Sequence, residues 1–272
     1  MYFVHDDDPA ENKAICALVN SGSDPGRLLK AAFSFYVKSL ENSLTAKNDF
    51  LEVRSGLFQG MRLSKEVLAS QLLPKVTGTY EKEVQDCIKE FSGSFDKFVD
   101  IGCAEGFYVA GISRWLKVPS LGIDIDPRSE GAVSYAAQAN QVSDYVSFST
   151  NIDEVRDFLE GSVLCLVDVD GSEMEVLRSF DHLCNSANSL SFVRLLVESD
   201  FSVDGVNNTP EIVGFLSSNG WNVDRILRQN PANRFEPSLS ELSFLDQVTR
   251  GIEGRPGGQS WIVASKSCGC QR

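Results

Sequence analysis

The chain has 272 residues, 42% of them hydrophobic and 23% charged, a composition typical of a globular protein with a substantial core. Its net charge of −13 disfavours a nucleic-acid partner, because an acidic surface repels phosphate backbones. No apolar run approaches the roughly 18 residues of a membrane helix, and the N-terminus lacks the basic start and apolar core of a signal peptide. We therefore expect a cytoplasmic protein with a small-molecule substrate, no nucleic acid and no membrane; a homodimer is left open.

The seven cysteines are odd in number, and Cys165 falls inside an apolar run. Both features predict reduced thiols in a reducing compartment. Cys268-Gly-Cys270 near the end has two thiols that could bind a metal, but it lacks a second ligand pair, so we expect a plain tail.

Residues 1–94 precede a regular α/β pattern, and we expect them to form a mostly helical cap that contributes to substrate binding. The expected elements are a helix at 27–44 after Asp24-Pro25, a short hairpin at 50–63, and helices at 66–73 and 81–91 that are broken at Pro74 and Gly78.

A strand, a tight loop and a helix are predicted from Phe98 onward. The apolar run F-V-D-I ends at Gly102, Gly106 follows, and a helical pattern then begins. Glycines let the backbone approach a ligand closely, and the start of the helix offers free N–H groups. A dinucleotide loop needs G-x-G-x-x-G, which fits poorly here, whereas a purely structural turn stays open.

The next predicted strand, S-L-G-I-D-I-D-P, places Asp124 about 20 residues downstream, where an acid can bind ribose hydroxyls. The order acid-x-Gly-x-x-x-Gly at Asp100–Gly106 resembles motif I of the class I S-adenosylmethionine-dependent methyltransferases. An acid at the end of the second strand is also a feature of that family. The resemblance covers about residues 95–265 and reaches weakly back to Gly78.

Strands and helices alternate from residue 95 onward, which predicts a parallel sheet with helices on both faces. The expected fold is α/β, with a Rossmann-like seven-stranded methyltransferase sheet at 95–272 beside the N-terminal cap. Strands are predicted at 97–101, 120–124, 145–149, 163–169, 190–198, 221–228 and 259–265, and helices at 106–116, 128–140, 152–159, 172–186, 209–219 and 238–250.

The fourth strand and its continuation, L-C-L-V-D-V-D-G-S-E-M-E-V-L, resemble the K-I-D-V-E-G-A-E-x-x-V-L signature of the FkbM-like methyltransferases. The sequence departs from that signature at Leu166 and Asp170. Two further stretches resemble uncharacterised bacterial relatives: G-T-Y-E at 78–81 and E-G-R-P-G-G-Q-S-W at 253–261. In the first, we expect Tyr80 and Glu81 to contact cofactor or substrate; alternatively, Thr79 is a helix N-cap and the acids at 81–83 lie in the first turn.

Four carboxylates are expected at the carboxyl ends of adjacent strands: Asp168, Asp170, Glu198 and Asp200. The alternation of strand side chains places the first two on one face, where ligands bind. They could hold Mg²⁺ or another divalent cation, supply a general base, or cap helices and pair with arginines.

The resemblance assigns the remaining site residues. Cofactor binding is expected from Tyr80, Glu81, Asp100, Gly102, Cys103, Ala104, Gly106, Asp124, Ile125, Asn151, Ile152 and Asp168, and substrate binding from Glu173 and Arg255. Asn151 could equally be a plain helix cap. The implied function is S-adenosylmethionine-dependent O-methylation of a sugar or natural-product hydroxyl. The alternatives are N-methylation of a small amine or peptide, and a catalytically silent S-adenosylmethionine-binding protein.

Overall fold

The computed structural model describes residues 13, 17, 20, 22, 28, 31–34, 50–64, 72–200, 205–228 and 259–269. The chain divides into two compact units, Met1–Asn48 and Asp49–Arg272, so residues 49–94 fall in the same unit as the sheet. In the first unit, residues 28 and 31–34 are helical and fall within the helix predicted at 27–44; the rest of that range lies outside the described residues. The helix predicted at 238–250 lies outside the described residues.

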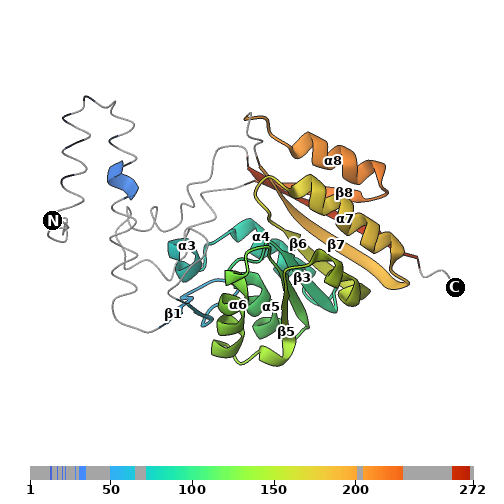
Figure 1. Ribbon diagram of the computed structural model, residues 1–272, viewed down its shortest axis with the longest axis horizontal. Helices are drawn as coiled ribbons and strands as arrows, with labels where there is room; N and C mark the ends of the chain where they lie inside the picture. Colours follow the sequence, from blue (N-terminus) through green and yellow to red (C-terminus); the bar gives the residue numbers. More distant parts are fainter. Residues whose placement is uncertain are drawn as a thin grey trace. The chain divides into compact units, whose positions relative to one another are not determined.

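The second unit is built on one seven-stranded sheet (Figure 1). In sheet order its strands are β5 (Val146–Ser149), β4 (Ser120–Ile123), β3 (Lys97–Ile101), β6 (Glu160–Val167), β7 (Ser189–Ser199), β9 (Ser260–Ser267) and β8 (Asn222–Arg228). The first five run parallel, whereas β9 pairs antiparallel with both β7 and β8. The predicted Rossmann-like methyltransferase sheet is confirmed. Its strand order switches direction at β3, with β4 on one side and β6 on the other.

Helices cover both faces of this sheet, as expected. They are α4 (Lys82–Phe91), α5 (Phe107–Leu116), α6 (Arg128–Ala139), α7 (Glu173–Ser186) and α8 (Thr209–Ser218), with 3₁₀ turns η1 (Ser143–Tyr145) and η2 (Ile152–Phe158). The segment predicted as a helix at 152–159 is therefore a 3₁₀ helix. Among the described residues, no helix combines the length and apolar character that crossing a membrane requires.

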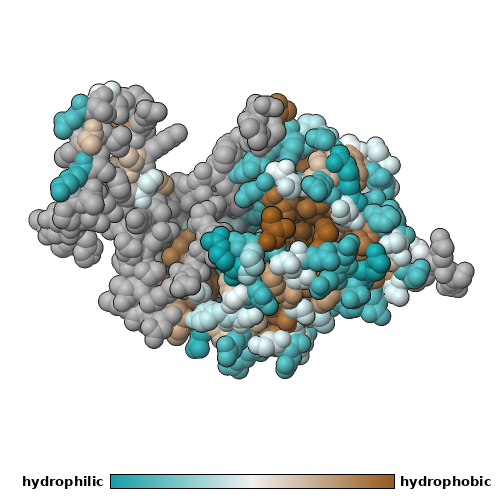
Figure 2. All heavy atoms as spheres, viewed as in Figure 1, coloured by the Kyte–Doolittle hydropathy of each residue, from teal (hydrophilic) through white to brown (hydrophobic). Residues whose placement is uncertain are grey.

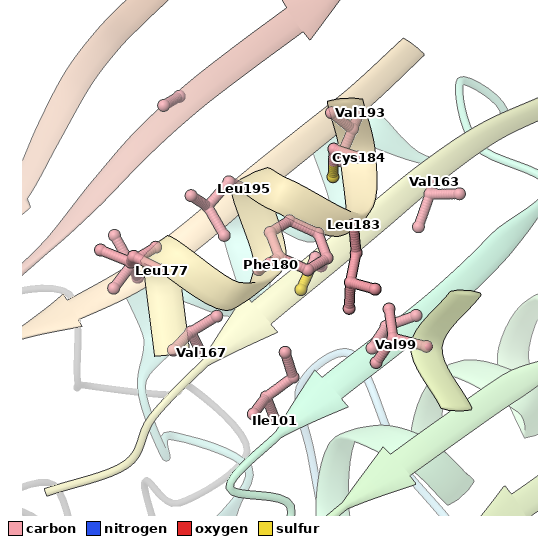
Figure 3. Packing of buried hydrophobic residues seen from close by; sticks show 14 of the residues in the cluster. Val99, Ile101, Val163, Val167, Leu177, Phe180, Leu183, Cys184, Val193 and Leu195 are labelled. Carbon is pink, nitrogen blue, oxygen red and sulfur yellow. The ribbon is translucent and has the colours of Figure 1, made fainter. Parts of the chain in front are cut away.

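The main core lies between the sheet and α7 and α8. Alternate residues of β3 and β6, such as Val99, Ile101 and Val167, point at Leu177 and Phe180 of α7, and all five are almost fully buried (Figure 3). A buried aromatic or branched side chain contributes about 1.5–3 kcal/mol to folding, so this layer fixes the sheet on which the site is built.

The opposite face of the sheet carries α5 and α6. Val109 of α5 and Val133 of α6 pack with Cys103, which follows β3. This packing holds the loop between β3 and α5 against the neighbouring helix. On the face shown in the space-filling view, hydrophilic side chains cover most of the described part, with an apolar area near α7 (Figure 2).

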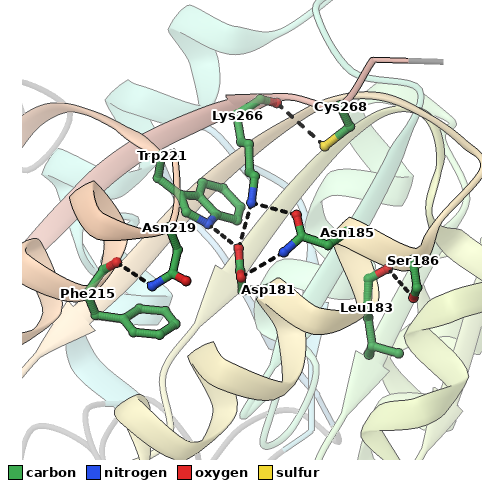
Figure 4. A network of polar contacts seen from close by, with 9 residues as sticks. All are labelled: Asp181, Leu183, Asn185, Ser186, Phe215, Asn219, Trp221, Lys266 and Cys268. Carbon is green, nitrogen blue, oxygen red and sulfur yellow. Dashed lines mark hydrogen bonds and ion pairs between the residues drawn. The ribbon is translucent and has the colours of Figure 1, made fainter. Parts of the chain in front are cut away.

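A buried polar network joins α7 to the end of β9 (Figure 4). Asp181 accepts hydrogen bonds from the Trp221 indole N–H at 2.7 Å and from the Lys266 ammonium at 2.8 Å. Lys266 also donates to the Asn185 side chain at 2.8 Å. Because the Lys266 ammonium and the Asp181 carboxylate neutralise and hydrogen-bond one another, the free-energy cost of burying each charge is largely offset.

In the segment before the sheet, the predicted hairpin and the helix predicted at 81–91 are confirmed. A two-stranded hairpin of β1 (Leu51–Glu52) and β2 (Arg62–Leu63) occupies the expected range. Helix α3 (Leu72–Thr77) continues through Pro74, so the predicted break there is wrong. Most of the helix predicted at 66–73 lies outside the described residues.

Candidate functional site

A cavity of about 990 Å³ opens at the carboxyl ends of β3, β4 and β6. Ligands of open α/β sheets bind at this edge, where the strand order switches direction. Twelve of the residues predicted for the site line it: Tyr80, Asp100, Gly102, Cys103, Ala104, Asp124, Ile125, Asn151, Ile152, Asp168, Asp170 and Glu198.

The glycine-bearing loop forms one wall of the cavity and lies against two strands. Gly102 has a φ of +92°, and a Cβ added there would lie 1.6 Å from the carbonyl oxygen of Asp168. Its N–H donates to the carbonyl of Ile123 at 2.7 Å. Only glycine allows this approach, so the loop holds the ends of β3, β4 and β6 together.

Asp124 joins the end of β4 to the same loop. Its carboxylate accepts a hydrogen bond from the Ala104 N–H at 2.8 Å and another from the Asp126 N–H at 2.8 Å. Each carboxylate oxygen has further acceptor capacity, so Asp124 can still receive the hydroxyls of a ligand. Ile125 follows at the rim and is 90% exposed, which leaves an apolar surface beside this acid.

Asn151 has the capping role that was one of its two predicted functions. Its side-chain oxygen accepts a hydrogen bond from the Asp153 N–H at 3.0 Å at the start of η2. Asn151 and Ile152 nevertheless line the cavity. The cap fixes the orientation of the Asn151 side chain at the wall.

Three of the four predicted strand-end acids come together. One carboxylate oxygen from each of Asp168, Asp170 and Glu198 lies within 4.8 Å of the others. Glu198 is buried, Asp168 is partly exposed and Asp170 is exposed. Asp200 does not belong to this group or line the cavity; it packs beside Asn208, whose side chain accepts from its N–H at 2.9 Å.

Asp100 is a buried acid at the floor of the cavity, with 2% of its surface exposed. Burial is the main cause that raises its pKa well above the usual value, and the negative charges of Asp168, Glu81, Asp124 and Glu105 raise it further. A carboxyl in such surroundings favours its protonated form in the free protein.

Tyr80 and Glu81 occupy different positions. Tyr80 lines the cavity, whereas Glu81 is turned toward α5, where it accepts a hydrogen bond from the Tyr108 hydroxyl at 2.7 Å. Glu81, with a φ of 43°, immediately precedes α4, so the alternative that Thr79 is the N-cap is wrong. Tyr108 itself lines the cavity beside Tyr80.

Two other predicted residues do not line the cavity. Glu173 is buried, and its two oxygens accept hydrogen bonds from the Gly171 N–H at 2.7 Å and the Asn208 side chain at 3.0 Å, so it fixes the turn before α7. Gly106 is the N-cap of α5 and packs against Val133. Arg255 lies outside the described residues.

One ion pair in the cavity wall was not predicted from the sequence. Lys75 of α3 pairs with Glu105 of the glycine-bearing loop, and the two side chains are 3% and 6% exposed. Its ammonium also lies 4.7 Å from the centre of the Tyr80 ring. The one feature of the sequence that could have pointed to this pair is a single lysine in the apolar run L-L-P-K-V, which belongs to no recognised motif.

No protein-family model matches the chain, and no curated protein matches it. Solved structures with a similar arrangement include a precorrin-6y C5,15-methyltransferase from Geobacter metallireducens, at 13% identity over 76% of this chain and 97% of that one, with a TM-score of 0.49. A ribosomal protein L11 methylase from Lactobacillus delbrueckii subsp. bulgaricus has 12% identity over 76% and 85%, with a TM-score of 0.47. An RNA methyltransferase from Salinibacter ruber in complex with S-adenosyl-L-homocysteine has 14% identity over 69% and 91%, with a TM-score of 0.40. Because these sequence identities and TM-scores are low, the fold is assigned from the strand order of the sheet itself.

Proposed function

We propose that this chain is an S-adenosylmethionine-dependent methyltransferase of the FkbM-like type that methylates a hydroxyl of a small molecule, such as a sugar or natural product. The observation that carries the proposal is the junction of Asp124 with the glycine-bearing loop at the cavity wall. It offers a carboxylate for ribose hydroxyls, an apolar rim residue for adenine, and a loop that a ligand can approach closely.

The reaction is an in-line displacement at the methyl carbon. A new bond forms between the acceptor oxygen and the methyl group, the carbon–sulfur bond breaks with its electron pair passing to sulfur, and S-adenosylhomocysteine leaves. The protein supplies position and a proton acceptor. Asp168 and Glu198 are our candidates for the acceptor of the hydroxyl proton, because both line the cavity at the ends of adjacent strands.

A divalent cation could take part at the same place. Asp168, Asp170 and Glu198 offer three carboxylate oxygens, the ligand type that Mg²⁺ and Mn²⁺ prefer. A bound cation would hold the acceptor hydroxyl and lower its pKa. Titration of Mn²⁺ into wild type and Asp170→Asn, followed by electron paramagnetic resonance, distinguishes the two forms of the mechanism. If wild type binds Mn²⁺ and Asp170→Asn binds it more weakly, the metal-assisted form is supported. If wild type binds no Mn²⁺, the metal-free base is supported.

Calorimetric titration of S-adenosylhomocysteine tests the cofactor site. Asp124→Asn keeps one acceptor for the loop but removes the charge, so we expect the dissociation constant to rise about 10- to 100-fold, as for a lost hydrogen bond to a charged group. Asp126→Ala is the matched control, because Asp126 is two residues away and does not line the cavity. Wild-type protein that binds no S-adenosylhomocysteine would contradict the proposal.

A further inference from the structure

Lys75 is an unusual residue for its surroundings. It is 3% exposed, lies in α3 well before the sheet in sequence, and still lines the cavity. A buried ammonium costs several kcal/mol in lost hydration unless it is paired and hydrogen-bonded. Its position in the cavity wall therefore calls for a partner of opposite charge.

Glu105 provides only part of that compensation. The Lys75 ammonium has three N–H donors, and one of them bonds to Glu105. The structure gives the other two no hydrogen-bond acceptor among the described residues; they lie beside the rings of Tyr80 and Phe107, whose centres are 4.7 and 5.9 Å from the nitrogen. Two donors on a nearly buried cation are thus available to a ligand in the cavity.

The charge of the cavity wall indicates which ligand group they would receive. Among the described residues that line the cavity, Lys75 is the single cation. The acids are more numerous: Asp100, Glu105, Asp124, Asp168, Asp170, Glu175 and Glu198. An anionic group in this cavity is repelled by the acids at short range, so Lys75 is the one side chain of the described wall whose charge attracts it.

We propose that Lys75, held by Glu105, binds the α-carboxylate at the methionyl end of the cofactor and makes the site selective for adenosyl thioethers that carry this carboxylate. The inference rests on the proposed function, because it takes the cofactor as the ligand. The placement is chemically consistent: the sulfonium and the α-ammonium of the cofactor are attracted by the acids, and its one anionic group, the α-carboxylate, is attracted by Lys75.

The test compares two ligands that differ in the carboxylate alone. The dissociation constants of S-adenosylhomocysteine and of its decarboxylated analogue, S-adenosyl-3-thiopropylamine, are measured by calorimetry for wild type and Lys75→Met. Wild type should bind S-adenosylhomocysteine about 10- to 100-fold more tightly than the analogue, the range for hydrogen bonds to charged groups. In Lys75→Met this ratio should fall close to one, while the affinity for the analogue changes little.

Two further variants separate recognition from folding. Lys75→Met leaves the Glu105 carboxylate buried and unpaired, so the double variant Lys75→Met/Glu105→Gln removes both charges and should show the same loss of discrimination. Lys266→Met is the matched control: Lys266 is also in a largely buried ion pair, with Asp181, but it lies outside the cavity. Its ratio should equal that of wild type.

Each outcome has a distinct meaning. If the ratio of the two dissociation constants stays at the wild-type value in both Lys75 variants, the inference is overturned. A wild-type ratio near one also overturns it. In both cases the proposed function stands. If the Lys75 variants bind both ligands more weakly by the same factor, Lys75 has only a structural role and the inference is overturned. If wild type binds neither ligand, the proposed function itself fails.

Discussion

Replacing Gly102 by alanine should damage both the fold and the cavity. The residue has a φ of +92°, which strains any side chain by about 1–2 kcal/mol. The added Cβ would also lie 1.6 Å from the carbonyl oxygen of Asp168. That carbonyl cannot retreat freely, because the Asp168 N–H is bonded to the Ile101 carbonyl at 2.9 Å where β3 meets β6. Relief of such overpacking adds about 1–3 kcal/mol.

Gly171 offers a matched control for the backbone strain. Its φ is +87°, but a Cβ added there meets no atom within 4 Å. We therefore expect Gly171→Ala to lose about 1–2 kcal/mol of unfolding free energy from conformation alone. Gly102→Ala should lose about 2–5 kcal/mol, the sum of strain and overpacking. The difference between the two variants isolates the contact with Asp168.

Urea unfolding followed by circular dichroism gives both free energies, and titration with S-adenosylhomocysteine reports on the cavity. Gly102→Ala should bind the ligand more weakly than Gly171→Ala does, because the loop must move away from the end of β6. Equal unfolding free energies and equal affinities for the two variants would refute the close approach that this reasoning assumes.

Two further predictions concern buried carboxyl groups. Asp100, whose pKa is raised mainly by burial, keeps its proton in the folded state where the unfolded chain has lost it, so its contribution to stability falls as pH rises from about 4 through the raised folded pKa. Asp100→Asn should thus be more stable than wild type at pH 8, and its advantage should shrink toward pH 4; urea unfolding at both pH values checks this, and a constant difference would contradict it. Asp181→Ala removes the acceptor of Trp221 and Lys266 and should cost about 3–5 kcal/mol in thermal unfolding, against under about 1 kcal/mol for alanine at the exposed Glu160; similar losses would refute the buried network.

The sheet was predictable from the sequence because its signals are local. The run at 98–101 ends at a glycine, and the helix that follows begins with Phe107, so β3 and α5 were placed to within a residue. The meeting of Asp168 and Glu198 followed from parallel strands alone, since their carboxyl ends share one edge.

Features that depend on contacts distant in sequence could not be predicted. Lys75 and Glu105 are 30 residues apart, and nothing in either local pattern links a lysine after a proline to the glycine-bearing loop. One of the two hydrogen bonds that Glu173 accepts comes from Asn208, 35 residues later, and this contact holds its side chain away from the cavity. Asp200 was predicted to join the acidic group but lies apart from it, because its backbone N–H is bonded to Asn208 beside α8.

A crystal structure of the chain with S-adenosylhomocysteine tests the central claim most directly. We predict the ligand in the cavity, with its ribose hydroxyls within hydrogen-bond distance of the Asp124 carboxylate and its adenine against Ile125. An empty cavity at saturating ligand, or a nucleoside bound elsewhere on the chain, would contradict the account.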